Sequence, residues 1–454
     1  MNAKQLADKL KPKQVWWPAR WLVPMVCLPL LVGLIAVTAF GYREWRAARA
    51  LPHELDAPAI EGQTATPDAW LDSMFRQSTS TAATAQWSEI FFLTSYGSWN
   101  KKDAVELPVV GSAPLPRLFE PREPWPLNAQ VEEYLQERRS LIERIHQAAQ
   151  LPTPVWQPLL LFDFATLLPA LDRVRYPLGL IQLEAEHAIY NAEAQRALAA
   201  ITNMQAIAES IDWKPIVVAQ VIAGRLRYSY LQTIQRSLHT ALWNAEQLRT
   251  LMRQIDQPIA VRESFQLSVR GDKGVMTLLL DSDRAVFAGM RLLKSPNAKL
   301  KLLDRYDQAL ALADQPGKRL SQLLETMEHD RPRSSESFLE ACLFPALSSY
   351  AALFENAELA RQQTLVALAI KLFTIEHNRL PMTLAELSQV GLSEQDWTID
   401  GVGSLGYEVD GSRAYVWGPQ HGKPAVAPQR PAVDTEKLEE ALQVTIVTFD
   451  APPS

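Results

Sequence analysis

Two pairs of residues have the types and spacing of a metal centre. Glu143 and His146, and again Glu184 and His187, stand three positions apart in segments with helical periodicity. Helical bundles that hold two iron ions use this pair on each of two helices, together with a single Glu from each of two further helices. Glu is abundant in this chain, so such pairs also arise by chance. We therefore interpret all four residues as solvated side chains on helix surfaces, and we expect neither a metal nor another cofactor.

Two further patterns match known motifs but stand in the wrong structural context. Residues 401–406 spell Gly-x-Gly-x-x-Gly, which binds dinucleotides when it follows a strand and opens a helix. Here Tyr407 and a hairpin signal follow, so we interpret the segment as a turn. Asp281 and Asp283 have the spacing of the metal-holding acid pair of glycosyltransferases, but helical side chains two positions apart point away from each other. The sequence contains no Gly-x-Ser-x-Gly, His-Glu-x-x-His or Walker motif, and we assign no catalytic residue.

An uncharged apolar run near the N-terminus predicts where the protein works. Residues 21–40 carry no charged side chain, and a helix of this length spans about 30 Å, the thickness of the hydrocarbon core of a bilayer. Aromatic residues, which prefer the headgroup region, stand at both ends of the run. They are Trp16, Trp17 and Trp21 at its start, and Tyr42 and Trp45 after it. The sequence therefore predicts a transmembrane helix over residues 21–42.

Charges on either side of the run predict its orientation. Five basic residues and one acidic residue precede it, whereas three basic residues and Glu44 follow closely. Positive charge favours the cytoplasmic side, so we expect the N-terminus inside and the large domain outside. A cleaved signal peptide is the alternative, because Val37, Thr38 and Ala39 offer a cleavage site. The apolar run exceeds the about 7–15 residues of a signal core, which favours an uncleaved anchor.

Composition limits the possible partners of the outer domain. The residues after position 42 include 40 basic and 50 acidic side chains, a net charge of about −10. Such a domain repels phosphate backbones, so we expect no nucleic acid as a partner. Cys27 lies within the apolar run and Cys342 in the outer domain, so they cannot pair with each other. The outer domain has enough apolar residues to bury a core.

Most of the outer domain has a helical signal. Glycine is scarce, at 18 of 454 residues, and strong helix formers dominate. From Asn128 onward, apolar residues recur with a period near 3.6. They are Val131, Tyr134, Leu135, Leu141, Ile142 and Ile145. We expect helices over 83–95, 159–190, 192–210, 214–239, 241–256, 258–292, 297–313, 316–329, 336–354 and 356–377. Short turns between them predict an irregular antiparallel array, and the prolines between 108 and 126 predict an irregular segment.

The last part of the chain predicts a small α/β module. Asn378 to Pro381 stops a helix, and Thr383 and Glu386 have the spacing of a capping box that opens another. Asp410 and Gly411 predict the turn of a β-hairpin. Residues 436–442 have the pattern of a short helix, and 444–449 that of a strand.

The two sides of this predicted hairpin are rich in large apolar residues. Tyr407, Val409, Tyr415 and Trp417 are expected to form one buried side of it. The helix that ends at Asn378 offers a matching stripe. The stripe consists of Val366, Ala369, Ile370 and Phe373.

The same C-terminal residues resemble a known group of proteins. Residues 367–381, 383–387 and 410–419 resemble the C-terminal module of an uncharacterised bacterial family of single-anchor exported proteins with a tetratricopeptide-like helical body. Residues 183–211 and 270–273 are similar to parts of that body. The module is also similar to the globular end of type II secretion pseudopilins, although this chain lacks their processing signal. The family has no assigned reaction, so the resemblance implies only fold and placement in a bacterial cytoplasmic membrane.

Together these features predict a mainly α protein with six parts. They are a cytoplasmic N-terminus (1–20), a transmembrane helix (21–42), a juxtamembrane helix with a linker and Pro-rich irregular segment (43–127), a helical body (128–377), a small α/β module with a β-hairpin (378–418), and a Pro-rich linker with a C-terminal tail (419–454). We expect a membrane-anchored extracytoplasmic scaffold that binds a protein partner. The alternatives are an exported enzyme acting on cell-envelope polymers and an accessory component of a secretion system.

Overall fold

The protein is mainly helical, with a small region of antiparallel sheet. The computed structural model describes residues 81–95, 106–116, 118, 124–152, 174–212, 217–281, 296–329, 347–399, 403–418 and 444–448. Within these residues, no helix is long and apolar enough to cross a membrane. The predicted transmembrane helix over 21–42 and the expected helix over 436–442 lie outside the described residues. So do parts of other expected helices, among them residues 159–173 of 159–190, residues 282–292 of 258–292 and residues 336–346 of 336–354.

The helices follow one another in the expected order. They are α4 (Thr81–Ser95), α6 (Asn128–Glu137), α7 (Arg139–Ala149), α9 (Arg175–Tyr190), α10 (Ala194–Asp212), α11 (Val217–Ser237), α12 (Ala245–Ile255), α13 (Val261–Asp281), α14 (Pro296–Ala313), α15 (Leu320–His329) and α17 (Leu347–His377). The expected break near residue 355 is wrong, because α17 runs through it without interruption. Conversely, the helix expected from Asn128 onward is divided into α6 and α7 at Arg138.

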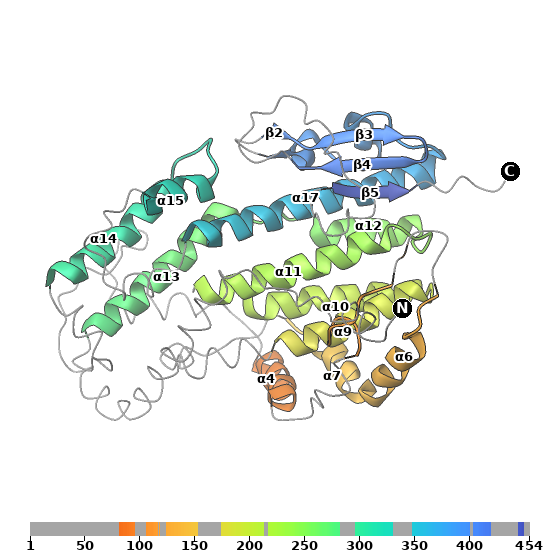
Figure 1. Ribbon diagram of the computed structural model, residues 1–454, viewed down its shortest axis with the longest axis horizontal. Helices are drawn as coiled ribbons and strands as arrows, with labels where there is room; N and C mark the ends of the chain where they lie inside the picture. Colours follow the sequence, from red (N-terminus) through yellow and green to blue (C-terminus); the bar gives the residue numbers. More distant parts are fainter. Residues whose placement is uncertain are drawn as a thin grey trace, which may run out of the picture.

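The long helix α17 forms the centre of the molecule. Every residue from 360 to 374 is buried, which requires a helix that is covered on all sides. In Figure 1, α11 and α12 lie along one side of α17, and the sheet lies along the other. Helices α9 and α10 continue the stack beyond α11, and α4, α6 and α7 lie at its far end. The helix α9 is thus placed between the centre of the body and the α6–α7 pair.

The end of α17 and the start of the C-terminal module differ in part from the expectation. Asn378 adopts a left-handed φ of 54° and ends the helix, as Asn commonly does at this position. Residues Leu384–Val390 form a 3-10 helix, η4, and the Thr383 side chain makes no capping hydrogen bond. The predicted capping box is therefore wrong. The Glu386 carboxylate instead accepts hydrogen bonds from the Met382 backbone N–H (3.0 Å) and Arg379 (2.6 Å).

The sheet region contains two antiparallel sheets. The smaller one pairs β1 (Thr398–Ile399) with β2 (Gly403–Ser404), after the 3-10 helix η5 (Glu394–Trp397). The larger one has the order β3 (Gly406–Asp410), β4 (Arg413–Trp417), β5 (Val444–Thr448). The predicted hairpin and the predicted strand near 444–449 therefore join one sheet.

The strand register corrects the prediction of which hairpin residues share a face. Tyr407 pairs with Val416, and Val409 pairs with Ala414, and residues directly opposite each other point to the same side of a sheet. Tyr415 and Trp417 therefore lie on the other face. The face of Tyr407 packs with the core that contains α17. Both faces of β4 are nonetheless buried.

The position of Gly406 has no room for a side chain, because Trp417 of β4 packs against it. A Cβ at this position would overlap the indole ring of Trp417, which lies opposite in the register. We expect Gly406→Ala to displace the ring and to lower the free energy of unfolding by about 1–3 kcal/mol, the usual cost of overpacking. Thermal unfolding measures this loss, with the exposed turn residue Ser412→Ala as control. Equal melting temperatures for the two variants would contradict the packing of Trp417 on Gly406.

A second apolar core joins α13, α14 and α15 to the first half of α17. Its large members are Phe265, Tyr306, Tyr350 and Phe354. At its edge, the partly buried Asp272 of α13 accepts a hydrogen bond from the backbone N–H of Val217, the first residue of α11 (3.2 Å). Asp272 thus caps α11 from a neighbouring helix. Burial raises the pKa of Asp272 to about 7, although the Val217 hydrogen bond lowers it.

This raised pKa predicts how stability depends on pH. The unfolded chain ionises Asp272 near pH 4, whereas the folded protein keeps it protonated to about pH 7. Stability should therefore fall as pH rises from about 4 to about 7, by at most about 1.4 kcal/mol per pH unit from this group. Asp272→Asn keeps an acceptor for Val217 and should flatten this slope in urea titrations. The exposed Asp304→Asn is the control, and an unchanged slope in Asp272→Asn would refute the assignment.

Candidate functional site

Helix α9 carries three ionisable side chains inside the protein. Glu184, Glu186 and His187 are 5%, 0% and 3% exposed. The prediction that Glu184 and His187 are solvated surface residues is therefore wrong. Burial of charge is costly unless it is paired, and each of these side chains has a charged partner from another helix. Glu184 and His187 face α6, α7 and α10, whereas Glu186 faces α11.

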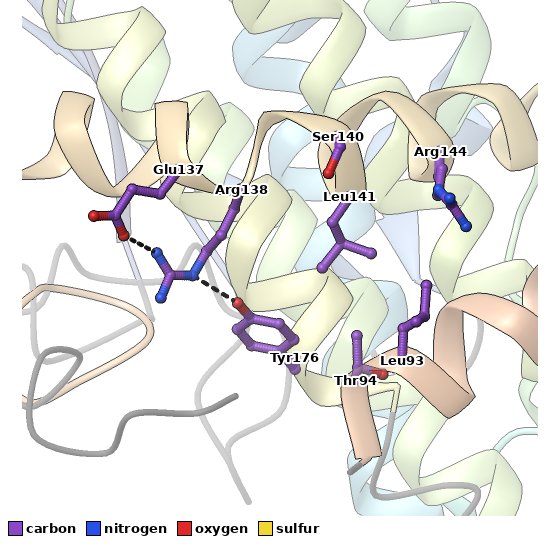
Figure 2. A pocket seen from close by; sticks show the side chains of 8 residues that line it. All are labelled: Leu93, Thr94, Glu137, Arg138, Ser140, Leu141, Arg144 and Tyr176. Atoms are coloured by element: carbon purple, nitrogen blue, oxygen red, sulfur yellow. Dashed lines mark hydrogen bonds and ion pairs between the residues drawn. The ribbon is translucent and has the colours of Figure 1, made fainter. Parts of the chain in front are cut away.

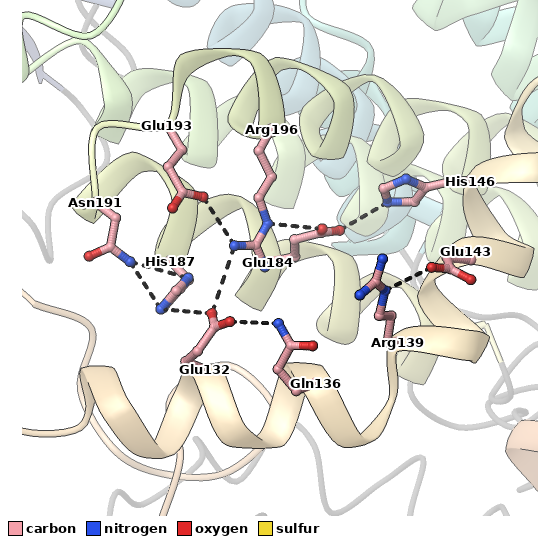
Figure 3. Close-up of polar contacts among 10 residues, drawn as sticks. All are labelled: Glu132, Gln136, Arg139, Glu143, His146, Glu184, His187, Asn191, Glu193 and Arg196. Carbon is pink, nitrogen blue, oxygen red and sulfur yellow. Dashed lines mark hydrogen bonds and ion pairs between the residues drawn. The ribbon is translucent and has the colours of Figure 1, made fainter.

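Glu184 is the centre of the polar cluster drawn in Figure 3. One carboxylate oxygen lies 3.0 Å from Nε2 of His146 on α7, and the other accepts a hydrogen bond from Nε of Arg196 on α10 (3.2 Å). Arg196 also donates to Glu193 (3.1 Å) and lies 3.8 Å from Glu132 on α6. Its guanidinium therefore stands between three carboxylates. Arg196 thus joins α10 to α6 and α9, and the contact between His146 and Glu184 adds α7 to the cluster.

His187 forms the other end of this cluster. Its ring contacts the side-chain nitrogen of Asn191 (3.0 Å) and the Glu132 carboxylate (3.5 Å). Burial and the nearby Arg196 lower the pKa of His187, although Glu132 opposes them. The pKa of Glu132 is lowered, mainly by a hydrogen bond from Gln136 and also by His187 and Arg196. These shifts favour a neutral imidazole beside an ionised carboxylate.

The structure unites the two predicted Glu-x-x-His pairs only in part. His146, Glu184 and His187 belong to the cluster, whereas Glu143 points away and pairs with Arg139 on the surface (2.9 Å). The surface interpretation therefore holds for Glu143. Sequence reasoning missed Glu132, Glu193 and Arg196. Glu132 stands one turn from Gln136, and Arg196 follows Glu193 by three positions, but neither spacing is distinctive.

The chemistry of the cluster suits an ion network better than a metal centre. The position between the carboxylates, where a bridging metal would bind, holds the Arg196 guanidinium. Among the residues with described placement, no group of three His, Cys, Asp or Glu side chains is arranged to hold a metal ion. No hydroxyl or thiol nucleophile contacts His146 in the described part of the chain.

We therefore expect the protein not to depend on a metal. Protein purified without chelator should contain far less than one metal ion per chain, and its melting temperature should be the same with and without a chelator. Glu184→Gln should lower the melting temperature without changing metal content, because it weakens the contacts with His146 and Arg196. Two metal ions per chain, lost in this variant, would show that the cluster is a metal centre.

The opposite side of α7 borders an open cleft of about 410 Å³. Figure 2 shows its lining side chains, which come from α4, α7, the α6–α7 junction and the start of α9. They are Leu93, Thr94, Glu137, Arg138, Ser140, Leu141, Arg144 and Tyr176. We call this space the α4–α7 cleft. Its volume lies within the range of about 300–1,000 Å³ that is usual for binding sites.

Beside the cleft, α4 presents two large apolar side chains to the surface. Phe92 and Leu93 are 59% and 45% exposed, although the opposite side of the helix is buried through Trp87 and Ile90. Helix α4 is therefore apolar on more than its core-facing side. Contiguous exposed apolar side chains next to a cleft are typical of surfaces that bind another molecule.

The structure describes only part of each of the other two predicted motifs. Gly403 belongs to the short strand β2 and Gly406 begins β3, so the described part of the glycine pattern leads into strands and not into a helix. Asp281 is the last residue of α13, and Asp283 lies outside the described residues.

No family model, curated protein or solved structure matches this chain. The resemblance to exported bacterial proteins therefore stays a prediction, and the functional argument depends on the geometry of the cluster and the cleft.

Proposed function

We propose that this protein is a membrane-anchored extracytoplasmic scaffold whose tetratricopeptide-like helical body binds a protein partner. The sequence supports the anchor and its orientation, through the apolar run of residues 21–40 and the basic excess before it. The α4–α7 cleft, bordered by the exposed Phe92 and Leu93, is the observation that carries the binding function.

The packing of the helices gives such a binding surface a rigid base. Consecutive helices α9, α10 and α11 pack side by side, and α17 closes the stack. Arrays of this kind present extended surfaces for binding. The ion cluster ties α6 to this stack through Arg196 and ties α7 to it through the contact between His146 and Glu184. It therefore fixes α7, the helix that forms one wall of the cleft. In this proposal the cluster is structural and the cleft is the binding surface.

Crosslinking in intact cells tests the proposed function. The full chain with an affinity tag is crosslinked, extracted from the membrane and compared with a control in which the same N-terminal segment carries an unrelated folded domain. We expect proteins that are recovered with the full chain and not with the control. Identical recovery from both would contradict a scaffold. Specific recovery of envelope glycan in place of protein would favour the alternative of an exported enzyme.

A further inference from the structure

The α4–α7 cleft places two guanidinium groups next to apolar side chains. Its lining residues include two guanidinium groups, of Arg138 and Arg144, and one carboxylate, of Glu137. Each arginine also pairs with a carboxylate, Arg138 with Glu137 and Arg144 with Glu89, so the cleft offers two guanidinium groups and no net positive charge. Leu93 from α4 and Leu141 from α7 provide the apolar part. A ligand that fills the cleft should therefore have apolar and anionic groups close together.

Arg138 is held in place by contacts that do not depend on Glu137. Its Nε donates to the Tyr176 hydroxyl (3.1 Å), its Nη1 donates to the Tyr134 carbonyl oxygen (3.2 Å), and its guanidinium carbon lies 3.5 Å from the centre of the Tyr134 ring. Within the described part of the chain, its Nη2 has no partner. The residue is therefore a preorganised cation with donor capacity left for a ligand.

The carboxylates that pair with the two arginines are exposed. The Glu137 side chain is 63% exposed, and the Glu89 side chain, which pairs with Arg144, is 58% exposed. Exposed pairs of this kind contribute about 0–1 kcal/mol, so a carboxylate of a ligand can replace them at little cost. The hydroxyl of Ser140 lies on the same wall. It is a further donor for an incoming oxygen.

We infer that the α4–α7 cleft binds an acidic, apolar segment of the protein partner. An apolar side chain of that segment packs between Leu93 and Leu141, and its Asp or Glu side chains bind Arg138 and Arg144. This inference rests on the proposed scaffold function and names the chemistry of its partner. A peptide is favoured over a small carboxylate because the exposed Phe92, which is not among the lining residues, extends the apolar surface beyond the cleft.

Three pools of fluorescein-labelled peptides test this inference. The pools have the same length and the same Leu and Ile content, with polar positions filled by Asp and Glu, by Asn and Gln, or by Lys. Binding to the full chain, held in nanodiscs of zwitterionic lipid, is followed by fluorescence anisotropy at low ionic strength, where charge attraction is least screened. We expect the acidic pool to bind at least about 10-fold more tightly than the amide pool, a difference of about 1.4 kcal/mol.

Single substitutions locate the binding to the cleft. Arg144→Gln should weaken binding of the acidic pool several-fold, and Glu137→Gln should strengthen it because a competing carboxylate is removed. Arg253 is an exposed arginine of α12 outside the cleft. Arg253→Gln is therefore the matched control and should leave the affinity for the acidic pool unchanged. Both glutamine variants in the cleft alter exposed residues, so a melting temperature equal to that of the parent confirms that the fold is retained.

Each contrary result overturns the inference. Equal binding of the acidic and amide pools, or no response to Arg144→Gln and Glu137→Gln, would show that the cleft is not the docking site. Displacement of the acidic pool by phosphatidylglycerol vesicles would show that the cleft recognises lipid headgroups. If crosslinking recovers a protein partner while the pools show no preference, the scaffold function stands and only the cleft assignment fails.

Discussion

Arg236→Ala is expected to lower the free energy of unfolding by about 3–5 kcal/mol, because it removes a guanidinium that pairs with a fully buried carboxylate. Glu186 has no exposed surface, and both of its oxygens accept from Nε of Arg236, at 3.0 and 3.2 Å. Arg236 also donates to the carbonyl oxygen of Pro116 (2.9 Å) and so holds this residue against α11. Urea unfolding measures the loss.

Two control variants separate the buried pair from ordinary surface charge. Arg139→Ala breaks an exposed pair with Glu143 and should cost no more than about 0.5 kcal/mol. The double variant Glu186→Leu with Arg236→Leu removes both charges and should be more stable than Arg236→Ala alone. If Arg236→Ala costs no more than Arg139→Ala, the buried pair does not hold α9 and α11 together.

Phe373→Ala should destabilise the C-terminal module by about 3–5 kcal/mol, the usual cost of removing a buried phenylalanine ring. Phe373 is fully buried near the end of α17. Its ring lies 4.2 Å from that of His377 and beneath the Arg379 guanidinium (4.9 Å), so it faces the chain that leaves the helix. Limited proteolysis should therefore show faster cleavage between residues 378 and 420, while the body before residue 330 stays protected.

The control for this change lies on the same helix. Ile375 is 46% exposed, and Ile375→Ala should change the free energy of unfolding by about 0.5 kcal/mol or less. Equal protection of residues 378–420 in Phe373→Ala and the parent would refute the packing of the module on α17. Loss of protection throughout the body would show that module and body unfold together.

The sequence predicts the helices well because their apolar periodicity is a local property. Val131, Leu135 and Ile145 are buried as their spacing requires. At the break, by contrast, Arg138 contacts Tyr176, which follows 38 residues later. The uninterrupted course of α17 depends on the elements that cover it on every side. Periodicity within one segment carries neither kind of information.

The buried cluster could not be predicted for a similar reason. Most of α9 is buried, so the helix has no clear division into an apolar side and a polar side. The sequence pattern therefore does not tell whether Glu184 and His187 are buried or solvated. Their burial is possible because Arg196 and Glu132 arrive from other helices. The same holds for the hairpin. A shift of one residue in the pairing of its strands would move Tyr415 to the other face of the sheet, and the local sequence does not fix that pairing. Long-range pairing, and not local pattern, sets the site.

Protease treatment of intact spheroplasts tests the central claim of an anchored protein with its body outside the cytoplasm. External protease is expected to digest the tagged C-terminal domain, and in untreated cells the full chain is expected to stay in the membrane fraction after a carbonate wash. A C-terminal domain that stays intact until the spheroplasts are lysed would contradict the orientation. Recovery of the chain in the soluble periplasm, shortened by cleavage after Ala39, would contradict the anchor.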